Sequence, residues 1–210
     1  MLQIILAIIA SYLIGSIPTA YIFGRILKGV DIRKFGSGNV GATNAMRVLG
    51  KWPGLTVLLI DILKGFLPIL LLSNLVKFEN ISTDILLIVL GFSCILGHTW
   101  TVFLNFKGGK GIATTLGVLI AMAIKIPGLN LVLGLLIFTW VVVFIVFRIV
   151  SIASIISAVF FPMYVFFFSG LHAIFILSII LSAFIIYRHK SNLKRLFHGE
   201  EPQLSFKKTK

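Results

Sequence analysis

Residues 149–187 carry no Lys, Arg, Asp or Glu, and this apolar stretch restricts the possible folds more than any other feature of the sequence. Roughly 20 apolar residues are needed to cross the hydrocarbon core of a bilayer, so the stretch is long enough for two spans. Ser169 and Gly170 form the natural turn between them. Charged residues make up 12% of the chain, whereas about 25% of a typical soluble domain is charged. The sequence therefore predicts an all-α integral membrane protein.

Seven segments are apolar enough to be transmembrane helices. They are Leu2–Gly24, Pro53–Leu75, Ile85–Leu104, Gly111–Ile126, Leu129–Phe147, Ile149–Phe168 and Leu171–Tyr187. The fourth segment is short, and a re-entrant loop is the alternative for it. The first segment lacks the basic start of a signal peptide and is too long for one, so we expect a retained span. We expect one integral-membrane domain over residues 1–210.

The distribution of basic residues predicts the orientation of these spans. With the N-terminus outside, 16 of the 19 Lys and Arg residues are cytoplasmic, whereas Lys77 and Lys125 are outside. The cytoplasmic regions are then Arg25–Trp52, Asn105–Lys110, Arg148 and everything after Tyr187. Cytoplasmic loops of membrane proteins carry such a basic excess, and a count of six spans would move the basic tail outside. We therefore expect seven transmembrane helices, a cytoplasmic C-terminus and no nucleic-acid partner for the net charge of +13.

The first cytoplasmic region contains the sequence FGSGNVGATNAMRVLG, residues 35–50. Gly36, Gly38 and Gly41 leave the backbone free to adopt positive φ and to approach a ligand closely. Short polar side chains and one cation accompany these glycines: Ser37, Asn39, Thr43, Asn44 and Arg47. An arginine beside such groups is suited to hold a phosphate through two hydrogen bonds. The alternative is a flexible loop with its arginine at the lipid headgroups, but the pattern favours ligand binding.

The second region, NFKGGKGIATTLG, covers residues 105–117. Its glycines are able to present successive backbone N–H groups to an anion, and a helix that begins near Ile112 favours the same anion at its N-terminus. The candidate binding residues are His98, Lys107, Gly108, Gly109, Lys110, Gly111 and Thr114. The motif is not a Walker A loop, because Lys110 is followed by glycine. Two lysines at the headgroups in a tight turn are the alternative, and His98, just before the loop, is more typical of a structural residue than of a base.

The third region, YRHKSNLKRLFHGEE, follows the last span. It places Arg188, His189, Asn192 and Arg195 within two helical turns, with His189 and Asn192 on one face. Attraction of anionic lipid is the alternative role for its basic residues. Inside the second span, Asp61 and Lys64 are three residues apart, and we expect them to form a structural ion pair rather than a catalytic one.

These motifs resemble a known family. GSGNVGATNAMR, GHTWTVFLNFKGGKGIAT and RHKSNLKRLFHGEE are similar to the three signature motifs of the bacterial membrane-integral acyl-phosphate:glycerol-3-phosphate acyltransferases, the PlsY family. GSIPTAYI, DILKG and FRIVSIASI, which contains Ser151, match as well. The resemblance covers nearly the whole chain in order, and three long motifs together are highly specific.

The resemblance implies a reaction and roles for residues. The family transfers an acyl chain from acyl phosphate to the 1-hydroxyl of glycerol 3-phosphate, giving lysophosphatidic acid and phosphate, at the cytoplasmic face of the bacterial inner membrane. It is the first acylation of phospholipid synthesis, and it implies a functional link to an enzyme that forms acyl phosphate. The residues that match catalytic positions are Ser37, Arg47, Lys110, His189 and Asn192. Ser151, Arg188 and Arg195 are implied to help bind substrate, and either Glu200 or Glu201 matches a structural glutamate.

The residues also bear on the mechanism. Acyl phosphate is an activated mixed anhydride, so positioning and charge stabilisation suffice without a covalent intermediate, and no cofactor or metal is expected. Acyltransferases that use acyl-CoA resemble each other in an H-x-x-x-x-D motif, but Phe103 follows His98 and Lys194 follows His189 at that spacing. We expect the three loops to converge and hold two phosphates, with a substrate phosphate or His189 accepting the hydroxyl proton. A transporter for phosphorylated solutes is the alternative, although the polar groups lie on one face of the membrane rather than near its midplane.

Overall fold

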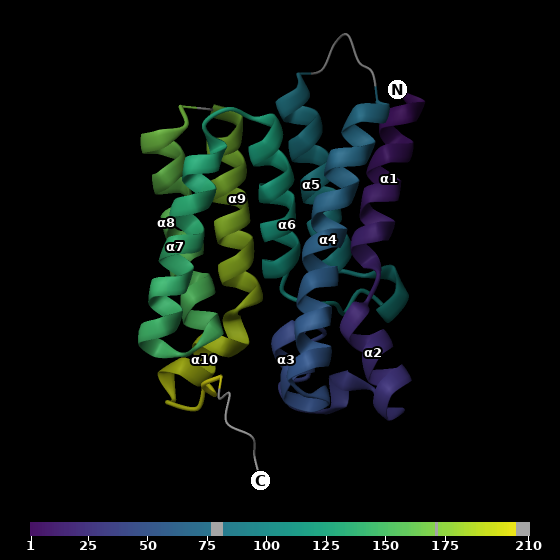
Figure 1. Ribbon diagram of the computed structural model, residues 1–210, viewed down its shortest axis with the longest axis vertical. Coiled ribbons are helices and arrows are strands. Elements are labelled where there is room, and N and C mark those ends of the chain that lie inside the picture. The colour runs from purple at the N-terminus through teal and green to yellow at the C-terminus, as the bar shows by residue number, and fades with distance from the viewer. Residues whose placement is uncertain (77–81, 171, 205–210) are drawn as a thin grey trace. The chain divides into compact units, whose positions relative to one another are not determined.

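The computed structural model describes residues 1–76, 82–170 and 172–204 and contains helices, turns and loops over these ranges. The chain divides into two compact units, Met1–Lys125 and Ile126–Lys210. Each unit is built of helices that follow one another along the chain (Figure 1). Lys77 and Leu171 lie outside the described residues, and the expectation of a single domain stays a prediction.

The first unit is a helical bundle whose polar loops lie at one end. Its helices are α1 (Leu2–Ser16), α2 (Thr19–Lys28), η1 (Ile32–Lys34), α3 (Ala42–Leu49), α4 (Lys51–Leu75), α5 (Thr83–Thr99), η2 (Val102–Leu104) and α6 (Ile112–Lys125). Within this unit, α2 and α3 lie at the end opposite the N-terminus (Figure 1). The loops that precede α3 and α6 therefore come from the same end of the bundle.

The first predicted span is broken in the structure. Leu2–Gly24 is not one helix, because α1 ends at Ser16 and α2 begins after Pro18 and continues to Lys28. Proline has no backbone N–H to donate within a helix, and its ring excludes the preceding turn. The break exposes the carbonyl of Ile17, which accepts a hydrogen bond from Lys64 Nζ at 2.8 Å.

Glycines allow the helices of this unit to approach backbone to backbone. A Cβ at Gly15 would overlap the backbone of Cys94, and one at Gly97 would overlap that of Tyr12, so α1 and α5 touch at these residues. Gly65 and Gly117 make the same kind of contact between α4 and α6. Small residues at helix crossings are typical of membrane bundles, where packing rather than water exclusion drives association.

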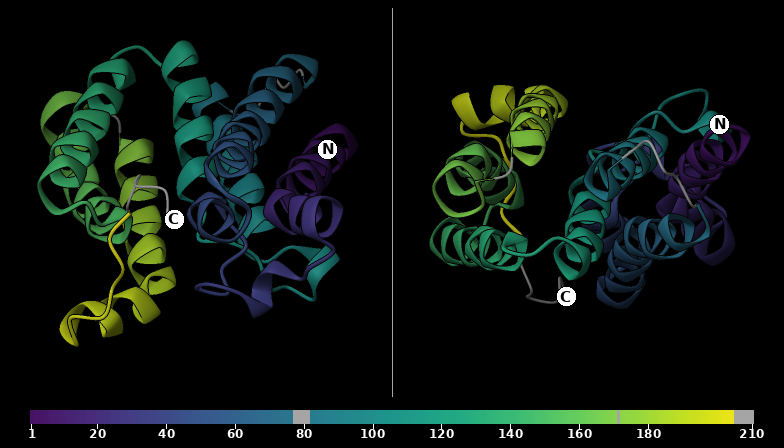
Figure 2. Two further views of the ribbon diagram at one scale, coloured as in Figure 1. Left: turned by 60° about the horizontal axis from the view of Figure 1, so that its bottom comes forward. Right: turned by 90° about the horizontal axis from the view of Figure 1, so that it is seen from above.

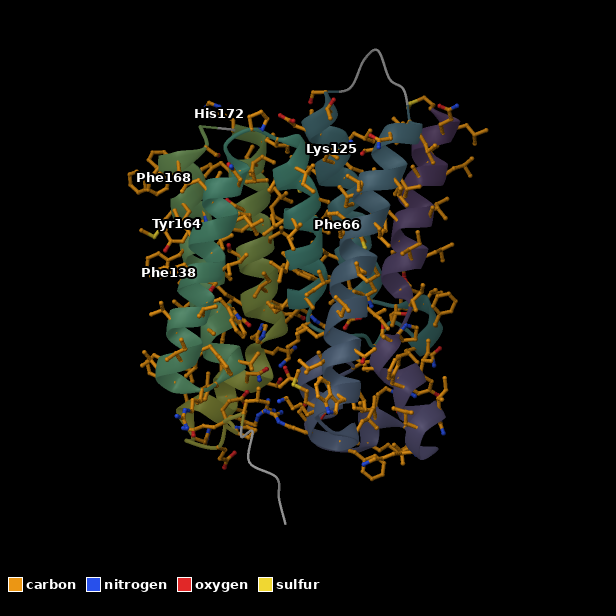
Figure 3. The ribbon with its side chains drawn as sticks, viewed as in Figure 1. Phe66, Lys125, Phe138, Tyr164, Phe168 and His172 are labelled. Atoms are coloured by element: carbon orange, nitrogen blue, oxygen red, sulfur yellow. The ribbon has the colours of Figure 1, made fainter. Side chains whose placement is uncertain are left out.

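The second unit consists of three long helices and a short one. They are α7 (Leu129–Phe147), α8 (Val150–Phe168), α9 (His172–Arg188) and α10 (Lys190–Phe197). α10 is bent by 57° from α9 and crosses the end of that helix (Figure 2). Phe138 of α7 and Tyr164 and Phe168 of α8 project from the same side of this unit (Figure 3). Phe138 and Phe168 are exposed, as is expected where lipid surrounds the helices.

The number of spans differs from the prediction. Five segments of the described residues are long and apolar enough to cross a membrane, and the bent pair of α9 and α10 makes a sixth. They are Leu2–Lys28, Lys51–Leu75, Thr83–Leu104, Leu129–Phe147, Val150–Phe168 and His172–Arg188 with Lys190–Phe197. The predicted fourth span, Gly111–Ile126, is the 14-residue helix α6, which is too short to meet the same test. The all-helical membrane fold is confirmed, whereas the count of seven is not.

Candidate active site

Asn44 holds the first glycine-rich loop together. Its side chain is fully buried, and its Nδ2 lies within hydrogen-bond distance of the carbonyl oxygens of Ile32, Phe35 and Asn39, at 3.2, 3.1 and 3.0 Å. Its Oδ1 accepts the backbone N–H of Ser37 at 2.9 Å. We predicted Asn44 among the phosphate-binding residues, and that role stays a prediction, whereas the observed contacts of its side chain shape the loop. It presents the exposed Ser37 at the tip.

Two glycines of this loop adopt the left-handed conformation. Gly36 has φ of 58° and Gly38 has φ of 71°, whereas Gly41 is extended at the start of α3. A Cβ at Gly36 would overlap Asn44 Oδ1, so a glycine is required at this turn for Asn44 to keep its position. The predicted backbone freedom is therefore used at the first two glycines and not at the third.

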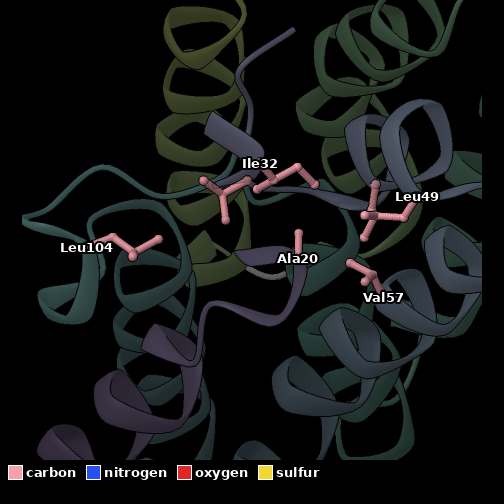
Figure 4. Packing of buried hydrophobic residues seen from close by; sticks show 7 residues of the cluster. Ala20, Ile32, Leu49, Val57 and Leu104 are labelled. Carbon is pink, nitrogen blue, oxygen red and sulfur yellow. The ribbon is translucent and has the colours of Figure 1, made fainter. Parts of the chain in front are cut away.

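Apolar side chains anchor the same loop to the bundle. The cluster consists of Ala20, Ile32, Val40, Ala45, Leu49, Val57 and Leu104 (Figure 4). It joins the loop to α2, α3, α4 and η2. The glycine-rich segment is thus polar at its tip and fixed by apolar packing at its base.

An ion pair that the sequence analysis did not single out also braces this loop. Asp31 accepts two hydrogen bonds from Arg33 Nε, at 3.0 and 3.3 Å, and one from Arg33 Nη2 at 2.7 Å. These bonds lower the pKa of Asp31 to about 2. Arg33 also lies over the ring of Tyr21, 5.2 Å from its centre. An acidic residue two positions before an arginine gives no sign of this geometry in the sequence.

The second loop is fastened to the end of α5 through its own backbone. Gly108 N–H donates to the carbonyl of Thr99 at 3.0 Å, and Gly109 N–H donates to that of His98 at 3.1 Å. These two amides are therefore engaged, so the N–H groups best placed for an anion are those at the start of α6. Gly111, which has φ of 86°, turns the chain into that helix, and Lys110 precedes it.

The first and second motifs meet at Gly109. A Cβ on this residue would overlap the His98 imidazole and would lie 3.0 Å from the carbonyl oxygen of Val40. Val40 belongs to the first motif and His98 to the second, so the structure brings these two predicted loops together within the first unit. The third motif belongs to the second unit, and its convergence with the other two stays a prediction.

Two hydroxyl groups in the first turn of α6 are buried. Among the described residues, Thr114 Oγ1 and Thr115 Oγ1 have no hydrogen-bond partner. The Oγ1 of Thr115 would lie 3.9 Å from a Cβ placed on Gly111, next to the start of the helix. Thr114 was predicted to bind substrate, whereas Thr115 was not singled out by any pattern in the sequence.

Asp61 and Lys64 form the predicted ion pair. Their side chains are 2% and 5% exposed, and Lys64 Nζ lies 2.8 Å from Asp61 Oδ1. The same oxygen accepts a hydrogen bond from Thr19 Oγ1 at 3.0 Å. His98 Nδ1 is 3.9 Å from it. The predicted pair is therefore part of a larger buried polar group that joins α2, α4 and α5.

In the second unit, Glu201 connects two polar residues of the third motif with Ser151 of α8. It accepts hydrogen bonds from Ser151 Oγ at 2.9 Å, Asn192 Nδ2 at 2.5 Å and Arg195 Nε at 2.7 Å. Its side chain is 4% exposed, whereas Glu200 is exposed, so Glu201 is the glutamate in a structural position. Burial raises the pKa of the Glu201 carboxyl, but the bonds from Asn192, Arg195 and Ser151 together lower it below its usual value.

His189 lies at the junction of α9 and α10. It is 3% exposed, and its Nδ1 is 2.8 Å from the carbonyl oxygen of Ile185. Because a carbonyl only accepts, the neutral ring carries its proton on Nδ1 and Nε2 is the nitrogen able to take up another. Arg188, next to it, is half-buried. Among the described residues, no group of three His, Cys, Asp or Glu side chains is arranged to hold a metal.

The fold and these residues define an integral membrane protein with cationic, glycine-rich loops suited to phosphate. A family model described as glycerol-3-phosphate acyltransferase matches residues 5–199. The glycerol-3-phosphate acyltransferase of Fusobacterium nucleatum subsp. nucleatum is 45% identical over 199 residues, covering 95% of this chain and 97% of that one. Glycerol-3-phosphate acyltransferase 2 of Moorella thermoacetica is 44% identical over 200 residues, covering 95% and 97%.

Solved structures agree with these relatives. A crystal structure of PlsY (YgiH), an integral membrane glycerol 3-phosphate acyltransferase, in its glycerol 3-phosphate form has a TM-score of 0.84 and 37% identity, and the match covers 96% of each chain. The lysophosphatidic acid form has a TM-score of 0.80 and 37% identity, covering 96% of this chain and 95% of that one. The chain belongs to the PlsY family of integral membrane glycerol-3-phosphate acyltransferases.

Proposed function

We propose that this protein transfers an acyl chain from acyl phosphate to the 1-hydroxyl of glycerol 3-phosphate. The products are lysophosphatidic acid and inorganic phosphate, in the first acylation step of bacterial phospholipid synthesis. Membership of the acyltransferase family supports the reaction, and the solved relatives in glycerol 3-phosphate and lysophosphatidic acid forms support the acceptor and the product.

The donor is inferred from the second motif. Its glycine-rich loop is held on the end of α5 and leads directly into the N-terminus of α6, with Lys110 beside it. This arrangement is suited to a phosphate group, which an acyl phosphate carries at its reacting end. The chain also lacks the H-x-x-x-x-D spacing after His98 and His189 that acyl-CoA enzymes share. Acyl phosphate is therefore the donor that the residues favour.

The proposed step needs positioning and charge stabilisation only. The glycerol hydroxyl oxygen attacks the acyl carbonyl carbon, the carbon–oxygen bond to phosphate breaks, and phosphate leaves with the electron pair. Arg47 and Lys110 offset the negative charge of the phosphates, and Ser37 at the tip of its loop orients a substrate. The hydroxyl proton passes to a substrate phosphate or to His189 Nε2.

The contacts of the third motif suggest how its residues divide their roles. Arg195 and Ser151 bind Glu201 and thereby hold Asn192, which shares that carboxylate. We propose that Asn192, His189 and Arg188 act on substrate, while Ser151, Arg195 and Glu201 position them. In the first unit, Asn39, Thr43, Lys107, Gly111 and Thr114 assist phosphate binding, while Gly108 and Gly109 assist it by shaping the loop, since their N–H groups are bound to Thr99 and His98.

The proposed setting is the bacterial inner membrane, with seven spans and the three motifs facing the cytoplasm. Basic residues concentrate on that side in the sequence, as in other membrane proteins. Both substrates would then be taken from the cytoplasm or its leaflet, and an enzyme that forms acyl phosphate would supply the donor.

Purified protein in detergent tests the donor directly. We expect lysophosphatidic acid from acyl phosphate and glycerol 3-phosphate without added metal or nucleotide, and phosphate release in equal amount. Acyl-CoA in place of acyl phosphate is the control and should give little product. Full activity with acyl-CoA and none with acyl phosphate would overturn the proposal for the donor.

A further inference from the structure

A buried carboxylate lies behind the second glycine-rich loop, residues 105–117, and the proposed mechanism gives this carboxylate no part. Asp61 is located in α4. Its Oδ1 accepts a hydrogen bond from Thr19 Oγ1 at 3.0 Å and lies 2.8 Å from Lys64 Nζ in an ion pair. A charged side chain within a membrane helix is costly unless it is paired, and Lys64 supplies that pairing. Lys64 is itself fixed by the carbonyl of Ile17 at 2.8 Å. The carboxylate is therefore held in place without help from His98.

His98 spans the distance between this carboxylate and the loop. Its ring is 6% exposed, and its Nδ1 lies 3.9 Å from Asp61 Oδ1. On the opposite side of the ring, Nε2 and Cε1 occupy the space that a Cβ on Gly109 would need. The carbonyl of His98 also accepts the N–H of Gly109 at 3.1 Å. The imidazole is thus enclosed between Asp61 and the backbone of the loop.

The position of α6 places this polar group beside the loop. The backbone of Thr114, in the first turn of α6, packs on Gly65, one residue after Lys64. The chain before α6 therefore passes close to the level of Asp61 in α4. A change in the orientation of His98 would be transmitted to Gly109 by direct contact, because the ring and the backbone have no space between them.

We propose that Asp61 is a positioning residue for phosphate binding. It orients the imidazole of His98, and the imidazole sets the path of the loop backbone at residues 108–111. The inference rests on the proposed phosphate-binding role of this loop. It assigns Asp61 a part in substrate binding that its ion pair with Lys64 alone does not require.

The test compares Michaelis constants for the two substrates. Lys110→Ala first identifies the substrate that the loop holds, since its KM should rise. Asp61→Asn keeps the shape of the side chain and should raise the same KM by about 3- to 30-fold, a range ordinary for residues that couple through contact. The other KM and kcat should stay within about threefold. Ser11→Ala removes a buried hydrogen bond to the Leu90 carbonyl between α1 and α5, so it should lower thermal stability and change neither KM.

A double-mutant cycle tests whether the effect passes through His98. In a His98→Ala background, Asp61→Asn should cause no further rise in that KM. Full additivity, or a folded Asp61→Asn protein with both KM values unchanged, would overturn the inference. If Asp61→Asn does not fold, Asp61→Asn with Lys64→Met removes the ion pair without leaving a lone buried charge and should show the same rise. A folded Lys110→Ala protein with both KM values unchanged would instead refute the proposed role of the loop.

Discussion

Gly109 shows how closely the phosphate loop is packed. Its φ is not in the left-handed region, unlike that of Gly111, so backbone strain is no obstacle to a side chain there. The obstacle is space, because a Cβ would overlap His98 and press on the Val40 carbonyl. The function of this glycine follows from its neighbours in the fold.

Gly109→Ala should reduce kcat/KM by roughly tenfold or more, since the loop must move away from His98 to admit the methyl group. Gly134→Ala is the matched control, because a Cβ at this position in α7 would meet nothing within 4 Å. Alanine also favours a helix more than glycine does, so the control should keep full activity. A Gly109→Ala protein with normal kinetics would contradict the packing argument.

Two of the cations of the first unit, Arg47 and Lys110, should matter through their charge. Arg47→Ala and Lys110→Ala each remove a charge-assisted contact to phosphate, and truncation of such contacts costs roughly 2–5 kcal/mol. Activity should fall on the order of tenfold to several thousandfold, as measured by initial rates on protein whose thermal stability is unchanged.

Lys125→Ala provides the control for these variants. Lys125 lies at the other end of α6 from Lys110 and donates one exposed hydrogen bond to Asn74. Its removal should leave turnover within about threefold, a barrier change below roughly 0.7 kcal/mol. If folded Arg47→Ala and Lys110→Ala proteins match this control, the phosphate-binding roles are wrong.

The sequence identified the motif residues but not the contacts that position them. Glycine spacing and the neighbouring cations were sufficient to single out both loops. The contacts of Asn44 with three carbonyl oxygens could not be predicted, because an asparagine in a polar loop has the same local sequence whether it faces a substrate or the backbone. The contact of Gly109 with Val40 joins residues far apart in the chain, and no local pattern encodes it.

The short helix α10 is connected to the rest of its unit through the Glu201 carboxylate. Glu201 follows α10, and it ties Asn192 and Arg195 of α10 to Ser151 near the start of α8. The N–H of Leu204 also donates to the carbonyl of Arg148, at the turn between α7 and α8, at 2.9 Å. The segment after α10 therefore holds that helix against the rest of its unit.

Glu201→Gln should loosen α10 while leaving the long helices intact. Hydrogen bonds to a charged group are worth about 1.5–3 kcal/mol, and the amide replaces the carboxylate in all three of them. Hydrogen exchange of α10 should increase, together with a lower thermal stability of the protein in detergent. Glu200→Gln alters an exposed side chain and should change neither; equal effects of the two variants would contradict the assignment of Glu201.

The same carboxylate gives this element a dependence on pH. The folded pKa of Glu201 lies below its usual value of 4.5, so its stabilisation is present above that pH and is lost as the pH falls toward the folded pKa. Exchange of α10 in the parent protein should therefore rise on acidification below about pH 4.5. In Glu201→Gln the exchange of α10 should be fast at every pH. Asp31, in the first unit, has a pKa of about 2 and is present in both proteins, so the difference between their pH profiles reports on Glu201 alone.

For the whole molecule, the number of membrane crossings depends on whether α6 spans the bilayer. Its 14 residues extend about 21 Å, which is less than the roughly 30 Å of the hydrocarbon core. Thr114 packs beside Gly65 in the middle of α4, while Lys125 reaches Asn74 near the end of α4. The polar loop that precedes Ile112 thus occupies the part of the chain where a full-length transmembrane helix would have its first turns. Hydropathy predicted this segment as Gly111–Ile126, close to the bounds of α6, but it could not show whether so short a helix crosses the membrane.

Charge placement nevertheless predicts that α6 crosses, and cysteine labelling would decide the matter. Cys94 is buried, so it contributes little background. If seven segments cross, a membrane-impermeant thiol reagent on whole cells should label Thr83→Cys and Asn130→Cys, whereas Lys34→Cys and Lys194→Cys should react only after permeabilisation. If α6 turns back instead, Asn130→Cys becomes protected and Lys194→Cys becomes accessible, while Thr83→Cys and Lys34→Cys keep their sides. These four exposed positions therefore separate the two topologies, because only those after α6 change sides.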